Sequence, residues 1–397
     1  MKRLIAFVSL LGCMVCVCVA GEPGAGNAGS PQILPLPGHP FGVVSSSDGR
    51  WVFVAIMSGS SGGSGIAVIE KDKEAYGLKR VVTVPGPTEL ALTHDGKVLI
   101  AAAGDSVFLL DCSRMISGSG DPVVGKFSDG PEAGSINVNV TADDKLLFVS
   151  DEGAGNITVI DLERVRSSGY DARAVIGKIP VGLAPIALVF SPDGHYLYTT
   201  SECAAESWGW PATVKPEGSG MNTGGQLTPE GAVVVIDVTK AKTDPEHSVV
   251  ARVPAGGSPV RMAISPDGRR IYVTARGSNA VLVFDAGKLV TDPGHAKEAT
   301  IPVGAAPVPL AIIQHGRTLV VGNSDRFGGD ASKPSYLSVL DIAKMGQGDS
   351  VAGRVEAGAF PREMCVSSDG TTLFLTNFMS GSLEVIDAEN PPIEPAR

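Results

Sequence analysis

The sequence repeats one pattern seven times, and this repetition limits the folds open to the chain more than any other feature. One copy reads SPVRMAISPDGRRIYVTARGSNAVLVFDA, residues 258–286. Each copy contains a short turn, and the first turn positions are Asp48, Asp95, Asp143, Asp193, Asp267, His315 and Asp369. Eight residues before these positions stand Pro40, Pro87, Ser135, Pro185, Pro259, Pro307 and Pro361. Six prolines in one register show that the copies are structural equivalents.

Each copy predicts four strands. The first runs from the proline to the turn, where Asp-Gly is a favoured hairpin connection. The second is rich in β-branched and aromatic residues, and the third ends in an apolar residue followed by Asp, as in Ile236-Asp237. A fourth segment leads to the next proline. Four antiparallel strands per repeat are typical of a propeller blade. We therefore predict an all-β, seven-bladed β-propeller over residues 31–390, followed by a tail at 391–397.

The ends of the repeat array predict how the ring closes. The seventh copy has no good fourth strand after Ile386-Asp387, whereas PQILPLPG (residues 31–38) looks like a fourth strand without its first three. We expect this N-terminal segment to complete the last blade, which removes the exposed sheet edges. The alternative is that residues 31–38 form only a loop.

The repeats resemble those of the YVTN-type, YncE-like β-propeller proteins. The tetrapeptide Ile271-Tyr272-Val273-Thr274 is the nearest to the one that names that family, and the similarity extends over residues 31–390. The resemblance implies the propeller fold. It implies less about activity, because such propellers are mostly exported proteins whose activity is poorly defined, and fold alone does not imply function.

The N-terminus predicts export. Residues 1–20 combine a basic start, an apolar run and small residues near Ala20, as a secretory signal does. Residues 21–30 form a Gly-rich tether. Leu10-Leu11-Gly12-Cys13 resembles a bacterial lipoprotein box, so lipidation of Cys13 is an alternative to simple cleavage near Ala20. A membrane anchor is disfavoured because the apolar run is too short. We expect a periplasmic or secreted protein, with or without a lipid anchor.

Charge and cysteine content exclude several classes of function. The formal net charge is −10, from 32 basic and 42 acidic residues, whereas nucleic-acid affinity needs clustered Lys and Arg. Three of the six cysteines lie in the signal, which leaves Cys112, Cys203 and Cys365 at wide spacing and without a CxxC pair. Zinc, redox and disulfide-scaffold interpretations therefore have no support. We expect a monomer.

The first strands of the blades predict a site at the channel. If the residues three and five positions after each proline face the core, those at two and four face the channel. At two positions after the proline the ring consists of Gly42, Glu89, Asn137, Ala187, Arg261, Pro309 and Glu363. Its polar members would converge at the channel mouth, as small-ligand sites require. The alternative is a set of polar groups that bind only water and each other.

A long insert, residues 203–230, interrupts blade four between its second and third strands. It carries two of the three tryptophans, Trp208 and Trp210. Because exposed aromatic residues are costly unless they pack or bind something, we predict a lid or a contact surface. The alternative is a loop that packs on its own blade.

We predict a binding or scaffold protein whose ligand or partner, a small molecule, a sugar or a protein, occupies the channel mouth. No cofactor and no catalytic residue is indicated. An alternative is a hydrolase similar to gluconolactonase-type propellers, in which Glu89, Asn137 and Glu363 hold a divalent cation; Arg261 would oppose that cation unless a glutamate paired with it. DNA binding, implied by YncE-like relatives, is a second alternative that the acidic charge and the predicted export disfavour.

Overall fold

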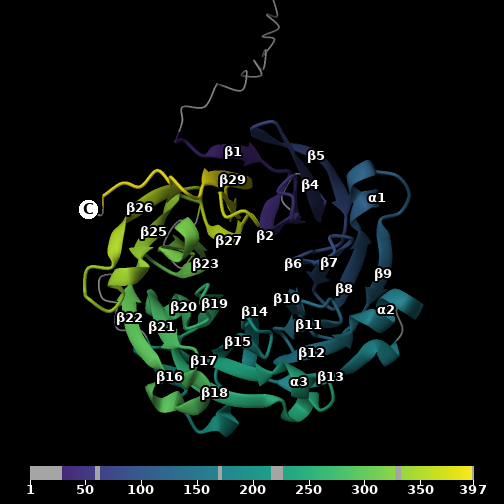
Figure 1. The fold of residues 1–397 in the computed structure, drawn as a ribbon. Coiled ribbons are helices and arrows are strands. Elements are labelled where there is room, and N and C mark those ends of the chain that lie inside the picture. The colour runs from purple at the N-terminus through teal and green to yellow at the C-terminus, as the bar shows by residue number, and fades with distance from the viewer. Residues whose placement is uncertain (1–28, 59–62, 169–171, 216–226, 327–331, 396–397) are drawn as a thin grey trace, which may run out of the picture.

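Seven antiparallel sheets surround a central channel in the computed structural model of the protein (Figure 1). The structure describes residues 29–58, 63–168, 172–215, 227–326 and 332–395. The predicted signal (1–20), Cys13, most of the tether (21–30) and residues 216–226 of the insert lie outside the described residues. The prediction of an all-β, seven-bladed propeller with four-stranded blades is confirmed.

The first three blades contain the following strands. Blade one has β2 (His39–Ser45), β3 (Trp51–Met57), β4 (Gly65–Asp72) and β5 (Ala75–Thr83). Blade two has β6 (Leu90–Leu92), β7 (Val98–Ala103), β8 (Ser106–Asp111) and β9 (Val123–Phe127). Blade three has β10 (Ser135–Val140), β11 (Leu146–Asp151), β12 (Asn156–Asp161) and β13 (Val175–Pro180).

The remaining blades follow the same order. Blade four has β14 (Leu183–Phe190), β15 (Tyr196–Cys203), β17 (Thr228–Asp237) and β18 (Val249–Gly257), with the short β16 (Thr213–Val214) added from the insert. Blade five has β19 (Pro259–Ile264), β20 (Arg270–Ala275), β21 (Ala280–Asp285) and β22 (Lys297–Pro302). Blade six has β23 (Pro307–Ile313), β24 (Thr318–Asn323), β25 (Ser335–Asp341) and β26 (Val351–Ala357). Blade seven has β27 (Pro361–Val366), β28 (Thr372–Asn377), β29 (Ser382–Asp387) and β1 (Gln32–Pro35).

Short helices follow the third strand in several blades. The α-helices are α1 (Cys112–Ser117), α2 (Leu162–Ser168), α3 (Val238–Ala241) and α4 (Lys288–Thr291). The 3-10 helices are η1 (Ala172–Ala174), η2 (Glu206–Trp208), η3 (Pro245–His247), η4 (Arg276–Ser278), η5 (Pro293–His295), η6 (Gln314–Gly316) and η7 (Ile342–Lys344). The aspartate that ends the third strand caps α1 and α3 through its side chain, at Asp111 and Asp237, which explains its recurrence. No described helix is long and apolar enough to cross a lipid bilayer.

The core consists of seven apolar clusters, one between each pair of neighbouring blades. Between blades four and five, for example, Tyr198 and Val233 pack with Val273 and Phe284. Between blades seven and one, Phe374 packs with Val54. The middle strands are buried on both faces, which is why the second and third segments of each copy are almost continuously apolar rather than alternating.

The N-terminal strand closes the ring, as predicted. β1 pairs antiparallel with β29, from Gln32 opposite Val385 to Pro35 opposite Ser382, and so becomes the outer strand of blade seven (Figure 1). The Gln32 side chain also joins this strand to blade one. Its amide nitrogen donates to the Tyr76 carbonyl at 2.7 Å, and its oxygen accepts from the Tyr76 amide at 3.0 Å. The first and last parts of the ring are therefore held in one sheet.

Candidate functional site at the channel mouth

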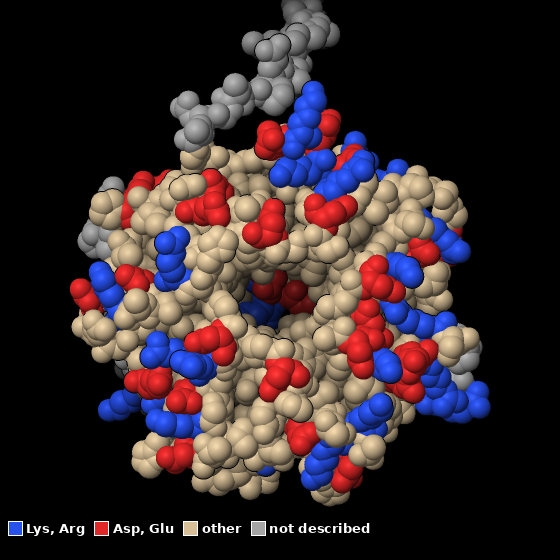
Figure 2. Space-filling model, in the orientation of Figure 1, with Lys and Arg blue, Asp and Glu red and all other residues tan. Residues whose placement is uncertain are grey.

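A channel passes through the middle of the ring, with acidic and basic side chains deep inside it (Figure 2). We call the end of the channel at which the first strands begin, next to the prolines of the repeat, the proline-side mouth. A bulge after this proline shifts the register before the second following residue, for example between Pro259 and Arg261 in β19 and between Pro361 and Glu363 in β27. The bulge re-aims the next side chain.

Three of the four predicted ring residues meet in one cluster, which we call the triad: Glu89, Arg261 and Glu363. Arg261 extends from blade five to blades two and seven. Its Nε donates to Glu363 Oε2 at 2.6 Å, and its Nη2 donates to Glu89 Oε1. The side chains are only 6%, 7% and 15% exposed for Arg261, Glu89 and Glu363. The convergence predicted from the repeat register is therefore present for these residues.

Threonines in the second strands hold the backbone of the triad. The Arg261 amide donates to the Thr274 hydroxyl at 3.2 Å, and the Glu363 amide donates to the Thr376 hydroxyl at 3.0 Å. Glu363 Oε1 accepts from the Met364 amide at 3.1 Å. Rigid strands thus position the charged groups, and each group has little freedom to turn away.

The two carboxyl groups of the triad differ in protonation. Burial, and then the neighbouring Glu363 charge, raise the pKa of Glu89 well above its usual range. Burial alone would also raise the pKa of Glu363, but Arg261 and a hydrogen bond from Glu89 outweigh it and hold that pKa below its usual range. Burial disfavours the charge on Arg261 too, yet the two carboxyl groups keep its pKa above the ordinary value. Glu89 is therefore the protonated member of the pair and Glu363 the ionised one.

One donor of the triad has no acceptor within the described part of the chain. Arg261 Nη1 is buried and lacks a hydrogen-bond partner there, although Nε and Nη2 are both engaged. A buried donor without an acceptor is costly, so this nitrogen marks the place where an acceptor from outside the protein is favoured.

A second arginine lies beside the triad. Arg362 places its guanidinium 3.7 Å from the centre of the Phe41 ring, a cation–π distance. Burial, and then the Arg261 charge, lower the pKa of Arg362; a guanidinium nevertheless stays charged at neutral pH. Across the described ranges, Arg362 makes no hydrogen bond and no ion pair. Two guanidinium cations therefore share one carboxylate charge.

Asn137, the fourth predicted ring residue, does not join the triad. It occupies the same position at the start of β10 and is half-buried. Its side chain forms no hydrogen bond with Glu89, Arg261 or Glu363. A short amide at this position does not reach across the channel as the long Arg261 side chain does.

The sequence analysis missed a second ring of residues at the mouth. These residues lie at the end of the second strand or directly after it, and they include Glu202 near the end of β15 and Arg276 after β20. Arg276 Nη2 lies 2.5 Å from Glu202 Oε2. Burial raises the pKa of Glu202 and lowers that of Arg276. Aligning the residues at the end of the second strand across the copies would have revealed this pair.

The tryptophans of the insert pack against each other and against their own part of the ring. Trp208 and Trp210 meet edge to face, with ring centres 5.1 Å apart. Both are half-buried against the apolar cluster between blades three and four, and Arg252 lies 5.2 Å from the Trp208 ring centre. Their predicted role as a lid or contact surface stays a prediction.

The donor set of the triad does not fit a metal ion. A metal would have to lie between the carboxylates of Glu89 and Glu363, and the Arg261 guanidinium already binds both. No hydrogen bond holds the Asn137 side chain toward the space between the Glu89 and Glu363 carboxylates. Elsewhere in the described ranges, no three His, Cys, Asp or Glu side chains are grouped as metal ligands.

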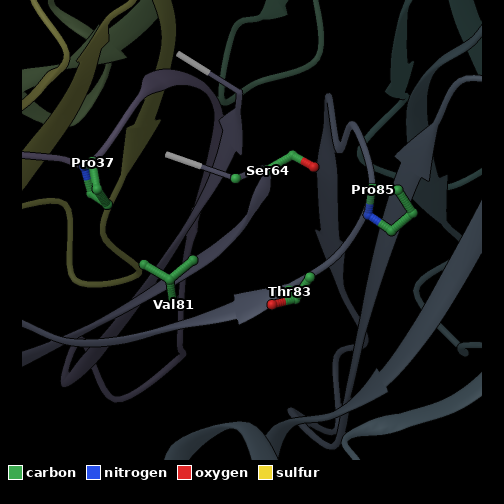
Figure 3. Close-up of a pocket in the computed structure, with 6 residues that line it drawn as sticks. Pro37, Ser64, Val81, Thr83 and Pro85 are labelled. Atoms are coloured by element: carbon green, nitrogen blue, oxygen red, sulfur yellow. The ribbon is translucent and has the colours of Figure 1, made fainter. Parts of the chain in front are cut away.

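A surface groove lies away from the triad, over blade one. It has a volume of about 610 Å³ and is lined by Pro37, Gly63, Ser64, Val81, Thr83 and Pro85 (Figure 3). None of these side chains is charged, and none belongs to the predicted ring. The groove is therefore a concave surface whose lining contains no charged acid, base or metal ligand.

Comparisons with known proteins agree with the fold. Residues 38–326 match the family model described as "Lactonase, 7-bladed beta-propeller". The hydrazine synthase of Kuenenia stuttgartiensis is similar in structure, with a TM-score of 0.64 and 19% sequence identity over 92% of this chain and 99% of that one. At such low identity, this likeness shows the fold alone. No curated protein sequence matches the chain.

Proposed function

The chain belongs to the lactonase family of seven-bladed β-propellers, and from this premise we propose that it binds a small organic anion at the proline-side mouth of its channel. The observation that carries the proposal is the buried Arg261 Nη1, a donor without an acceptor in the described chain. An oxygen of the ligand supplies that acceptor.

The charge of the mouth supports an anion rather than a neutral ligand. Glu89 holds a proton and Glu363 is ionised, so the triad by itself is neutral. Arg362 then adds a further positive charge beside it, and in the described ranges this guanidinium forms no ion pair. A monoanion balances this charge at low cost because the groups are already desolvated and held in place.

Titration calorimetry at constant ionic strength tests the proposal with sodium acetate and sodium phosphate as probes and sodium chloride as the reference. We expect saturable binding to the parent protein and at least tenfold weaker binding to Arg362→Gln. Arg269→Gln is the matched control, because Arg269 has a side chain that is 85% exposed and should bind as the parent does. Equal affinity of the parent and Arg362→Gln for every probe would contradict the proposal.

The second candidate is lactone hydrolysis without a metal, favoured by the opposite pKa directions of Glu89 and Glu363. Glu363 accepts a proton from water as the water oxygen attacks the lactone carbonyl. Arg261 Nη1 donates to the oxyanion that forms. Glu89 then gives its proton to the ring oxygen as the ester C–O bond breaks, which yields the hydroxy acid. The proton that Glu363 took from water returns to Glu89 through the hydrogen bond between the two carboxyl groups. Each group is a Brønsted acid, a Brønsted base or a hydrogen-bond donor within one cluster.

Turnover of sugar lactones and aliphatic lactones distinguishes the two candidates. If the chain is a hydrolase, a pH-stat assay records acid release that resists EDTA, and Glu363→Gln lowers kcat by at least a hundredfold. If the chain only binds, the parent protein and Glu363→Gln both leave the lactones intact, while the calorimetric binding of anions persists in the parent.

We also propose that the protein is exported, as its N-terminal sequence and its resemblance to YVTN-type, YncE-like propellers predict. N-terminal sequencing of the protein from fractionated cells should place the mature end near Gly21. Incorporation of labelled palmitate that is lost in Cys13→Ser would instead support the lipoprotein form. Full-length chain retained in the cytoplasm would contradict both.

A further inference from the structure

The residue directly before the proline position of the repeat adopts a left-handed backbone conformation in six of the seven blades. The residues and their φ angles are Gly86 (57°), Gly134 (60°), Ala184 (49°), Ser258 (47°), Ala306 (47°) and Phe360 (57°). Glycine adopts this conformation readily, whereas a residue with a bulky side chain does so at a cost. Five blades accordingly use a small residue here, and blade seven uses phenylalanine. A strained conformation at a bulky residue suggests a functional role.

Phe360 belongs to a group of rings at the proline-side mouth, which we call the aromatic shelf: His39, Phe41, Phe360 and Phe378. The Phe360 and Phe378 ring centres lie 5.4 Å apart, and His39 stacks on Phe378 at 4.7 Å with an interplanar angle of 16°. Phe360 and Phe378 are half-buried. The next residue, Met379, is 41% exposed.

Hydrogen bonds keep the shelf rigid. The Phe378 amide donates to the Phe360 carbonyl at 2.9 Å. The carbonyl of Phe378 lies 2.8 Å from His39 Nδ1. The shelf therefore exists before a ligand arrives, and binding to it costs little conformational entropy.

Positive charge borders the shelf. Arg362 lies over Phe41, and Phe41 meets Phe378 edge to face with ring centres 6.3 Å apart. The Arg326 guanidinium lies 5.5 Å from the Phe360 ring centre and acts electrostatically on Arg362. An apolar aromatic surface and a cation without an ion pair in the described ranges thus lie together at one edge of the mouth.

We propose that the aromatic shelf selects a planar ring-bearing carboxylate. The carboxylate pairs with Arg362, and the ring packs against the half-buried Phe360 side chain. The inference rests on the proposed anion binding and adds the chemical class of the ligand. It also accounts for the strained Phe360, because the smaller residues used in the other blades would satisfy the backbone better but offer no stacking surface.

Calorimetry with acetate, cyclohexanecarboxylate and benzoate tests the class of ligand. These acids share one charge and differ in the presence and the planarity of a ring. We expect the parent protein to bind benzoate at least threefold more tightly than cyclohexanecarboxylate, and at least tenfold more tightly than acetate. Equal affinities for the three acids would overturn the shelf proposal and leave the anion site intact. Binding of none of them would overturn the anion site itself.

Substitution at Phe360 tests the residue assigned. In Phe360→Gly, benzoate affinity should fall at least tenfold, to the level of acetate, while acetate affinity stays within twofold of the parent. Ala306→Gly is the matched control, because it relaxes the same backbone conformation in blade six without removing a ring. Phe360→Leu retains apolar volume and should also lose the preference for benzoate over cyclohexanecarboxylate, so it serves if the glycine variant fails to fold. An unchanged preference in folded Phe360 variants would overturn the assignment.

Discussion

At the scale of single residues, the triad shows how a buried charge is tolerated in the channel. Arg261 is held by two carboxyl groups, so the cost of removing a guanidinium from water is offset by paired hydrogen bonds. The arrangement depends on space beside Glu89. Gly42, its neighbour from blade one, supplies that space, because any Cβ at position 42 would overlap Glu89 Oε2 and the Thr88 carbonyl.

Gly42→Ala should therefore disturb both the triad and the fit between β2 and β6. We expect the free energy of unfolding to fall by about 1–3 kcal/mol, the usual cost of overpacking, and anion affinity to fall with it. Urea unfolding measures the first effect and calorimetry the second. Gly77→Ala is the matched control, since a Cβ there meets no atom within 4 Å; if both variants lose equal stability, crowding of Glu89 is not the cause.

A second buried carboxyl group makes stability depend on pH. Burial, and then the nearby Asp129 charge, raise the pKa of Asp151 to about 8. The folded state then retains a proton that the unfolded state releases above its usual pKa of 3.8. The stability from this proton is complete below about pH 4 and is lost progressively as the pH rises to about 8.

Asp151→Asn should remove this pH dependence. Urea unfolding at several pH values from 4.5 to 8.5 should show a decline in stability for the parent that is flatter in the variant. Asp267→Asn is the control. The hydrogen bond from Ser265 lowers the pKa of Asp267, so the stability that this group contributes is lost only below about pH 4, and the curve of this variant should run parallel to that of the parent from pH 4.5 to 8.5. Parallel curves for the parent and Asp151→Asn would contradict the assignment.

At the scale of secondary-structure elements, hydroxyl groups join neighbouring blades. At four junctions, a Ser or Thr hydroxyl in the second strand of one blade donates a hydrogen bond to the next blade. The acceptor is the backbone carbonyl of the residue directly after the proline position. The pairs are Ser150 with Ile186 (3.1 Å), Thr200 with Val260 (3.2 Å), Thr274 with Val308 (2.9 Å) and Thr376 with Phe41 (2.7 Å). Blade two has Ala102 at the equivalent position, and there Thr88 donates to Ile136 at 3.1 Å instead.

Thr274→Val should weaken the junction between blades five and six. The substitution keeps the shape of the side chain but leaves the Val308 carbonyl without its donor and the Arg261 amide without its acceptor. We therefore expect a loss of about 1–3 kcal/mol in unfolding free energy. Thr83→Val, at an exposed position in β5, should change stability by less than about 0.5 kcal/mol. Thermal and urea unfolding should both show a larger loss of stability for Thr274→Val than for Thr83→Val. Equal losses in the two variants would show that the Thr274 hydroxyl does not stabilise the junction.

The elements were predictable from sequence because each has a local signal. The proline, the Asp-Gly turn and the apolar runs recur in register, so strand order and channel-facing positions followed. For the triad, the sequence predicted that the three side chains face the channel, but not that they pair with one another. Whether Asn137 or Arg261 bridges the channel depends on side-chain length and bulge geometry, which the repeat does not encode. The Glu202–Arg276 pair was missed because it lies at the end of the second strand rather than in the first.

At the scale of the whole molecule, the ring depends on its N-terminal strand. β1 covers the edge of β29, and Leu36 adds a backbone hydrogen bond from its amide to the Gly381 carbonyl at 2.8 Å. Without β1, blade seven has an unpaired edge, and such edges associate with other chains.

A variant that begins at Pro37 should therefore lose stability and aggregate, whereas a variant that begins at Gly29 should behave as the parent does. Light scattering during heating and size-exclusion chromatography measure the difference. Monomeric behaviour of the shorter variant, with an unchanged melting temperature, would show that β1 does not seal the ring.

The pairing of β1 with β29 also sets an order of events on the ribosome. Residues 32–35 are made before the other strands of the ring, and their partners, residues 382–387, after them. At roughly 5–20 residues per second, a nascent chain carries this segment for roughly 20–70 seconds before its partner has been synthesised. The ring can therefore close only after residues 382–387 have been made, however early the other blades assemble.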